Sequence, residues 1–278
     1  MAEKEKKAIF LVEFLTELIL SVTMKNFLPI LLLILISCLQ KREKFVNSDN
    51  ILVAPDAAAI YKFIGEIETP DGYARTPVAK NSFAEWLRTL PLKKDKRVFL
   101  YNGSLKPNQS AQFAVVDIPI GNKDLQQCAD AVMRLRAEYL YLNKKPIAFM
   151  DFSGKWYNWN GEGNRMMFEN YLLNVFGWCG SASLDRQLNP VTHFSTIKAG
   201  DVLVRGGFPG HAITVVDIAT NNNGQKVYLL AQGYQPAQDI HVLNNPMDAS
   251  LSPWYAVDTA TLIITPEWRF SRENLKTC

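Results

Sequence analysis

The chain has 278 residues, of which 48% are apolar, 21% charged and 11% aromatic. This balance excludes a disordered, collagen-like or low-complexity chain, and the length allows one large domain or two small ones. Thirty Lys and Arg against 27 Asp and Glu give a net charge of +3, and no block of five or six like charges occurs. Nucleic acid is therefore not an expected partner.

The N-terminal segment carries an uninterrupted apolar run at residues 27–37, FLPILLLILIS. Its roughly eleven residues are too few for a helix across a bilayer, which needs about 20, but they suit the apolar region of a signal peptide. Lys25 supplies the positive charge that precedes such a region. We therefore expect residues 1–37 to act as a signal peptide, with Met24 as the true start.

The last residues of this run, Leu35-Ile-Ser-Cys38, resemble the bacterial lipobox. That resemblance implies cleavage before Cys38, lipidation of its thiol, and a membrane partner held through the lipid anchor. The expected location is the cell envelope, at the outer membrane or facing the periplasm, with residues 38–50 as the lipidated cysteine and a polar tether. The alternative is one long membrane helix over residues 9–37. Glu13 and Glu17 oppose it, because a charge at mid-membrane costs about 2.5–3.5 kcal/mol.

Residues 51–118 are expected to form a small α/β lead-in region rather than an independent core. The stretch 81–90, NSFAEWLRTL, has Ser82 three residues before Glu85, a spacing typical of a capping box, so a helix is predicted there. Residues 98–101 are predicted to form a strand that enters a tight turn at Asn102-Gly103, with residues 111–120 as its partner.

Residues 119–270 are expected to form the main domain. The pattern of 124–141, DLQQCADAVMRLRAEYLY, predicts its clearest helix, with Cys128 close to the N-terminal end. The loop 153–164 contains Trp156, Tyr157 and Trp159, which either line a substrate-binding groove or pack on their own domain. A further helix is predicted at 166–176, and strands at 147–152, 202–204, 212–219, 227–232, 239–243 and 261–265.

Three residues occur in an order that can support nucleophilic catalysis. Cys128 lies near a helix start, where the partial positive charge of the helix lowers a thiol pKa. His211 opens a predicted strand and offers an imidazole base, and Gln232 ends the next strand, where a polar group can orient that imidazole. Asp124 and Asp130 lie close to Cys128 and oppose a strongly lowered thiol pKa.

This order, together with Gly200-Asp201 and Gly210-His211, resembles the papain-like cysteine hydrolases, above all their NlpC/P60 and CHAP branches. The resemblance covers roughly residues 120–245. It implies an α+β fold in which a helix bearing the cysteine packs on an antiparallel sheet bearing the histidine. It further implies that Cys128 is the nucleophile, His211 the general base and Gln232 the orienting group in the hydrolysis of cell-wall peptide or amide bonds, without a cofactor.

Nearly the whole mature chain resembles the bacterial family of the domain of unknown function 4846, which carries no established activity. The shared segments are SFAEWLRTLPLK, LQQCADAVMRLRAEYLY, GDVLVRGGFPGHAITVVD, LLAQGYQPAQDIHVL and TPEW.

The sequence leaves open several alternatives for the roles of single residues and for the function of the chain. His241 is a rival base or orienting group, and a metal site from His211, His241 and Asp217 lacks any supporting spacing, so no metal is expected. Cys179 is either a structural thiol or a disulfide partner of Cys128 or Cys278. Two alternatives to an enzyme also remain. The first is a catalytically inactive envelope lipoprotein that binds a glycan or peptide through Trp156, Tyr157 and Trp159. The second is a structural envelope lipoprotein with no small ligand.

Overall fold

The computed structural model describes residues 61–278. The expected signal peptide with its start at Met24, the lipidated Cys38 and the tether therefore lie outside the described residues. Among residues 61–278, no helix combines the length and the apolar character that crossing a membrane requires.

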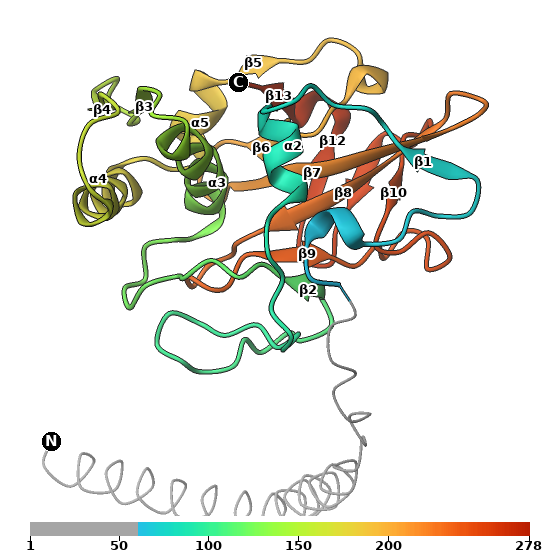
Figure 1. Cartoon of the computed structure of the whole chain (residues 1–278), viewed down its shortest axis with the longest axis horizontal. Coiled ribbons are helices and arrows are strands. Elements are labelled where there is room, and N and C mark those ends of the chain that lie inside the picture. Colours follow the sequence, from blue (N-terminus) through green and yellow to red (C-terminus); the bar gives the residue numbers. More distant parts are fainter. Residues whose placement is uncertain (1–60) are drawn as a thin grey trace, which may run out of the picture. The chain divides into compact units, whose positions relative to one another are not determined.

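A nine-stranded antiparallel sheet organises the described residues (Figure 1). Its main path runs in the order β2-β9-β8-β7-β6-β13-β5, while β1 also pairs with β7 and β10 with β8. The strands are β1 (Tyr73–Arg75), β2 (Gln112–Val115), β5 (Asn189–Pro190), β6 (Val202–Arg205), β7 (His211–Asn221), β8 (Lys226–Gln232), β9 (His241–Leu243), β10 (Tyr255–Ala256) and β13 (Leu275–Thr277).

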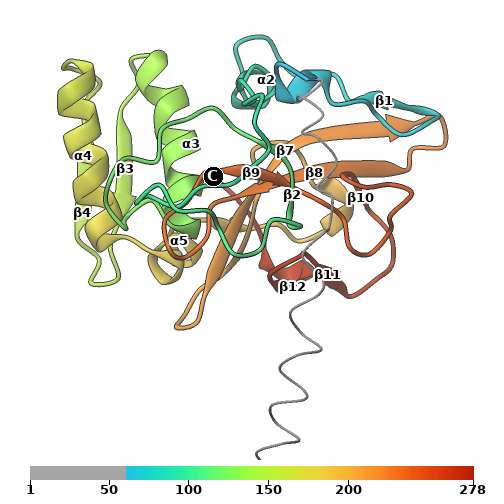
Figure 2. The same ribbon diagram turned by 90° about the horizontal axis from the view of Figure 1, so that it is seen from below.

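Helices and two hairpins surround this sheet, so the expected α+β class is confirmed. The helices are α2 (Phe83–Arg88), α3 (Cys128–Leu142), α4 (Arg165–Trp178) and α5 (Ser181–Gln187), with single turns η1 (Ile64–Glu66), η2 (Phe194–Thr196) and η3 (Arg272–Asn274). The hairpins are β3 (Ile147–Met150) with β4 (Trp156–Trp159), and β11 (Leu262–Ile264) with β12 (Arg269–Ser271). Figure 2 shows α2 and the β11–β12 hairpin on opposite sides of the sheet.

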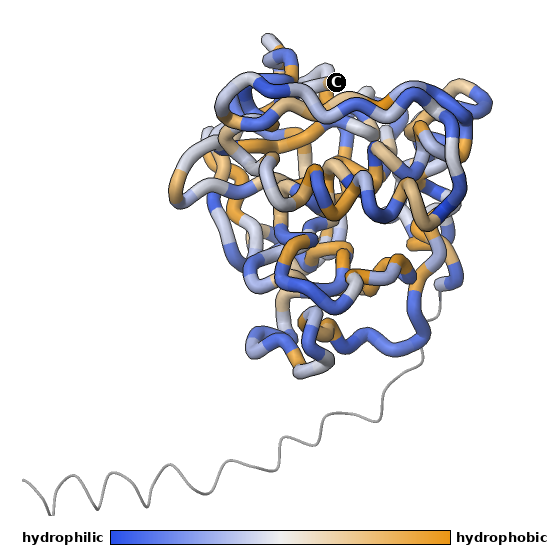
Figure 3. Tube along the Cα trace, turned by 90° about the vertical axis from the view of Figure 1, so that its left-hand side faces the viewer, coloured by the Kyte–Doolittle hydropathy of each residue, from blue (hydrophilic) through white to orange (hydrophobic). Residues whose placement is uncertain are grey.

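Strand β8 shows why the sequences of the central strands are continuous apolar runs. Val227, Leu229 and Ala231 pack in the cluster that contains α2 and part of α3. Tyr228 and Leu230 point to the opposite face, into the cluster that contains Phe270 of β12. Alternate side chains of a strand face opposite sides, so a strand covered on both faces needs apolar residues at every position. In Figure 3, hydrophobic segments lie mostly inside the trace and hydrophilic ones mostly at its periphery.

The helix predicted within residues 81–90 is present but shorter, and of the expected capping box only the Ser82 half forms, because the Glu85 carboxylate accepts from the Asn81 amide instead of the Ser82 amide. The Ser82 hydroxyl accepts a hydrogen bond from the Glu85 amide at 3.2 Å, and α2 follows directly. The helix predicted over 124–141 begins later, at Cys128, because residues 124–127 form turns in which the Gln127 amide bonds to the Leu125 carbonyl.

The strand pairing expected in the lead-in region is wrong. Residues 98–101 form only isolated bridges, Phe99 with Leu105 and Leu100 with Gln238. Strand β2 pairs with β9 instead. The Asp239 carboxylate accepts from the Phe99 amide at 3.0 Å, which takes up a backbone donor that a regular ladder would use.

Residues 61–118 belong to the same sheet as the later strands and share one compact unit with them. A buried ion-pair cluster joins the two regions, in which Asp217 of β7 accepts from Arg75 at 2.8 Å and from Arg88 at 2.7 Å. Asp217 is fully buried, so these two arginines supply the compensation that its charge requires.

Candidate functional site

Cys128 is the first residue of α3, at the end where helix amides lack intrahelical partners. The Asp130 carboxylate accepts from the Gln127 amide at 3.0 Å and thereby fixes the start of the helix. Gly233, just after β8, makes close contact with this turn. A methyl group at position 233 would lie 2.9 Å from both the Ala131 Cβ and the Gln127 carbonyl oxygen. The helix start is therefore held directly against the end of β8.

His211 is the first residue of β7, and a glycine is required immediately before it. A Cβ on Gly210 would lie 2.2 Å from the Ser181 hydroxyl and 2.6 Å from the Gly207 carbonyl oxygen. No larger residue fits there, which explains the Gly-His pair of the sequence in terms of packing. The imidazole is only 2% exposed. It lies among the rings of Tyr234, Trp268 and Phe270, with centroid distances of 5.0, 5.2 and 5.8 Å.

The tautomer of His211 follows from its hydrogen-bond partners. Gln232 Nε2 lies 2.7 Å from the Glu267 carboxylate, which pairs with Lys106 and therefore acts as an acceptor, so the Gln232 amide turns its NH₂ group toward Glu267. Its carbonyl oxygen then lies 2.9 Å from His211 Nε2. That ring nitrogen must therefore carry the proton and donate. Nδ1 is left as an unprotonated base, the form that accepts a proton from a nucleophile.

Behind Gln232 the polar network continues through His241 and Lys106. Lys106 Nζ donates to Glu267 at 2.6 Å. His241 Nδ1 donates to the Asp239 carbonyl at 2.9 Å, and its Nε2 accepts from Gln232 Nε2 at 3.3 Å. His241, the rival base of the sequence analysis, is fully buried and thus supports Gln232 from behind.

Sequence reasoning missed Glu267 and Lys106 as members of this network. Glu267 lies in the segment TPEW, the last of the shared motifs, which follows β11. The shared segment TPEW could have drawn attention to Glu267. Its local pattern, however, gave no indication that Glu267 contacts Gln232, 35 residues earlier in the chain.

Electrostatics favour a neutral thiol and a neutral imidazole in the free protein. Burial raises the pKa of the Cys128 thiol and the Asp130 carboxylate raises it further, although the amides of Ala212, Ala129 and Cys128 itself act to lower it. The lowered thiol pKa expected from the helix start alone is therefore wrong for the free protein. Burial lowers the pKa of His211 to about 4, against the opposing effect of the Gln232 hydrogen bond.

Cys128 and His211 both line one cavity of about 550 Å³. The Ala212 amide, adjacent to His211, acts on the Cys128 sulfur, which places the start of β7 next to the start of α3. Within residues 61–278 no hydrogen bond joins the sulfur to the imidazole. Catalytic hydrogen bonds are commonly loose before substrate arrives.

The mouth of this cavity carries exposed aromatic side chains. Phe152, Trp178 and Phe208 line it and are 63%, 66% and 93% exposed. Exposed aromatic side chains that gather around one cavity are typical of a binding site, whereas single exposed ones are common on any protein. Among the described residues that line the cavity there is no Lys or Arg, whereas Asp124 and Asp130 are present.

The aromatic residues predicted to bind substrate lie elsewhere. Trp156, Tyr157 and Trp159 form strand β4, within the stretch expected to be a loop, and none of them lines the Cys128 cavity. Tyr157 and Trp159 are buried in the cluster that contains α4, where Trp159 packs against Phe168, while Trp156 is 49% exposed. For Tyr157 and Trp159 the structure shows packing on their own domain.

A metal site and a disulfide at these residues both lack structural support. The Asp217 carboxylate is taken up by two arginines, and residues 61–278 contain no cluster of three or more potential metal ligands. Cys128, Cys179 and Cys278 are all free thiols. Burial raises the pKa of Cys179 to about 12, as expected of an unreactive structural thiol.

We predict that His241 makes folding stability depend on pH. Burial first, and then Lys106, lower its pKa from 6.5 to about 3 in the folded protein. Between these pH values the unfolded chain binds a proton at His241 and the folded protein does not. The free energy of unfolding should therefore fall as the pH drops, by up to about 1.4 kcal/mol per pH unit relative to His241→Gln. Denaturant titrations of both proteins from pH 7 to 3.5 measure this difference, and parallel curves would contradict it.

We also predict that Asp130→Asn lowers the pKa of the Cys128 thiol, since it removes a nearby negative charge while keeping an oxygen for the Gln127 amide. The measurement is the rate of iodoacetamide labelling of Cys128 against pH, resolved by peptide mass spectrometry. Cys278 in the same digest is the internal control, and Asp117→Asn is the matched exposed variant. An unchanged profile for Cys128 would show that Asp130 does not act on the sulfur.

Comparison with known proteins yields one match. The model of the domain of unknown function 4846 matches residues 64–167 and 145–277. Neither the curated proteins nor the solved structures contain a significant match. The matched segments extend over most of the chain and include Cys128, His211, Gln232 and Glu267. The chain therefore belongs to the family of the domain of unknown function 4846.

Proposed function

We propose that this protein is a cysteine hydrolase of amide bonds, with a papain-like arrangement of the NlpC/P60 type. One observation carries the proposal: Cys128 at a helix start and a His211 whose Nδ1 is held as a free base line the same cavity. A thiol, a neutral imidazole and a polar group that orients it are the elements of nucleophilic acyl transfer.

In the proposed reaction His211 Nδ1 takes the thiol proton as the Cys128 sulfur attacks the carbonyl carbon. The amide C–N bond then breaks, the proton passes from His211 to the departing amine, and a thioester remains on Cys128. Water, deprotonated by the same nitrogen, attacks the thioester and releases a carboxylic acid together with the free thiol. The Cys128 amide, an N–H without an intrahelical partner, is placed to stabilise the oxyanion.

The resting charge state determines how this site would work. The free protein favours a neutral thiol and a neutral imidazole. The proton therefore moves from the Cys128 thiol to His211 only while the sulfur attacks the substrate. Substrate that displaces water and shields Asp130 from the sulfur would favour the thiolate. We therefore expect slow alkylation of Cys128 in the free protein, but acylation by a bound amide substrate.

The cavity also indicates the chemical class of substrate. The described lining includes Asp124 and no Lys or Arg, which favours a neutral or amine-bearing substrate over an anionic one. Burial raises the pKa of Asp130, the other acidic residue of the wall, so Asp130 contributes less to this preference. The exposed rings of Phe152, Trp178 and Phe208 offer flat apolar surfaces to a sugar or peptide. A peptide bond next to an amine-bearing residue in cell-wall material is the substrate we propose.

The second candidate is a binding module that uses the same cavity without catalysis. It is favoured by the exposure of Phe208 and Trp178, because binding alone explains an aromatic rim. In this alternative Phe152, Trp178 and Phe208 form the contact surface for a glycan or peptide. Tyr157 and Trp159 do not, because they are buried.

A cell-wall digest separates the two candidates. The hydrolase should release new amine and carboxyl termini from purified peptidoglycan fragments, detected by mass spectrometry. Cys128→Ala should abolish release, and Gln232→Ala should reduce it at least tenfold because the imidazole loses its orienting acceptor. Cys278→Ala, which removes another free thiol, is the matched control and should act as wild type.

The binding module gives the opposite pattern. No bond is cleaved, Cys128→Ala retains fragments as well as wild type does, and Trp178→Ala weakens their retention. Release that persists in Cys128→Ala would contradict the proposed nucleophile.

We further propose that the protein is an exported lipoprotein anchored through Cys38 in the cell envelope. Support comes from the sequence Leu35-Ile-Ser-Cys38 after an apolar run. A substrate in the cell wall fits this location. Cys38→Ala should leave an unprocessed precursor without the lipid, seen as a larger band by immunoblot and as loss of labelled fatty acid. Unchanged processing and lipid labelling would refute the anchor.

A further inference from the structure

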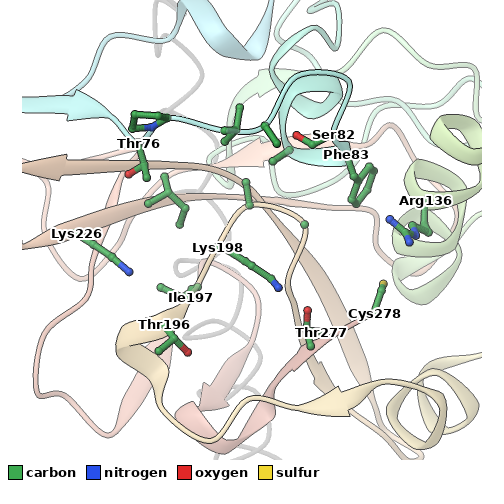
Figure 4. A pocket seen from close by; sticks show the side chains of 17 residues that line it. Thr76, Ser82, Phe83, Arg136, Thr196, Ile197, Lys198, Lys226, Thr277 and Cys278 are labelled. Atoms are coloured by element: carbon green, nitrogen blue, oxygen red, sulfur yellow. The ribbon is translucent and has the colours of Figure 1, made fainter. Parts of the chain in front are cut away.

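A second cavity, of about 440 Å³, shares no lining residue with the cavity of Cys128 and His211. Its wall comes from α2, from α3, from the segment after η2 and from the end of β13 (Figure 4). Volumes of this size are typical of small-molecule sites.

Most of the wall is apolar. It includes Pro77, Val78, Phe83, Ala84, Ile197 and Ile218. A ligand that fits there would bury an apolar body, and the apolar wall would also strengthen any charge–charge contact by keeping water away.

Three cationic side chains interrupt the apolar wall: Arg136, Lys198 and Lys226, all visible in Figure 4. Among the described residues that line the cavity there is no Asp or Glu. Lys226 Nζ donates to the Ser195 carbonyl at 2.8 Å. Arg136 and Lys198 form neither an ion pair nor a side-chain hydrogen bond within residues 61–278.

Arg136 differs in this respect from other partly buried cations of the fold. Arg75, Arg88, Lys106 and Arg134 each pair with a carboxylate at 2.6–2.8 Å. Arg136 instead lies over the rings of Phe83 and Tyr139, with its Cζ 5.1 and 5.9 Å from their centroids. Stacking holds the guanidinium plane in place and leaves its N–H donors without a described acceptor.

We propose that this cavity binds an amphipathic organic carboxylate. The Arg136 guanidinium donates two N–H hydrogen bonds to the carboxylate oxygens, Lys198 supplies a second positive charge, and Phe83 and Ile197 contact the apolar body. Fixed guanidinium donors favour planar carboxylates, and no Asp or Glu among the described residues lines the cavity to compete for them.

Cys278 provides a built-in reporter, because it lines this cavity and its thiol is free. With the full chain, 4-phenylbutyrate should saturably slow alkylation of Cys278 and leave Cys128 in the same digest unaffected. The alcohol 4-phenylbutanol has the same apolar body without the charge, and acetate has the charge without the body. Each should bind at least tenfold more weakly than 4-phenylbutyrate.

Variants test the two cations. Lys198 is exposed, so Lys198→Gln should leave the thermal unfolding temperature unchanged. The same substitution should weaken the binding of 4-phenylbutyrate at least fivefold. Arg136→Gln together with Lys198→Gln should abolish protection of Cys278. Arg269→Gln, an exposed arginine outside the cavity, is the control and should bind as wild type.

The proposal is overturned if 4-phenylbutanol or acetate protects Cys278 as well as 4-phenylbutyrate does. Failure of all three to protect it would overturn the proposal too, as would equal loss of binding in Arg269→Gln. These outcomes are measured at Cys278 and do not require Cys128 to be a nucleophile, so they are independent of the hydrolase assignment.

Discussion

The hydrogen bond from Gln232 Nε2 to the Glu267 carboxylate is the interaction on which the site depends. It fixes which way the amide of Gln232 points, the amide fixes which nitrogen of His211 carries the proton, and the remaining nitrogen becomes the base. Lys106 in turn holds Glu267 at 2.6 Å, so this ion pair behind Gln232 fixes the orientation of the groups next to the cavity. Buried networks of this kind are costly unless every member is satisfied.

The two cavities differ in charge in a way that separates their ligands. The cavity of Cys128 is acidic and aromatic at its mouth, while the second cavity is apolar and cationic. Helix α3 contributes to both, with Cys128 at its first turn and Arg136 two turns later. An amine-bearing amide and an organic carboxylate would thus bind at different places on the same helix. The products of amide hydrolysis carry these same two groups, an amine and a carboxylate.

Much of the fold was predictable from local pattern. The capping spacing of Ser82 and Glu85 marked the start of α2, and the strand expected at residues 227–232 is β8. Cys128, His211 and Gln232 were predicted together from their order along the chain and from the resemblance to papain-like hydrolases; Cys128 and His211 line one cavity, and Gln232 lies behind His211. The pairing of β2 with β9 was not predictable from local pattern, because the partner of an edge strand is set by packing between residues far apart in the sequence. Glu267 was missed for the same reason, and the aromatic rim was missed because exposure of Phe152, Trp178 and Phe208 depends on loops that meet only in the fold.

The most direct test of this account is the tautomer of His211, read from the nitrogen chemical shifts of its ring by ¹⁵N NMR of the full chain near neutral pH. The account predicts a neutral ring with the proton on Nε2 and a free Nδ1, and loss of this preference in Gln232→Ala. A ring protonated on Nδ1, or a charged imidazolium at that pH, would contradict it, because the base proposed for the Cys128 thiol would then not exist.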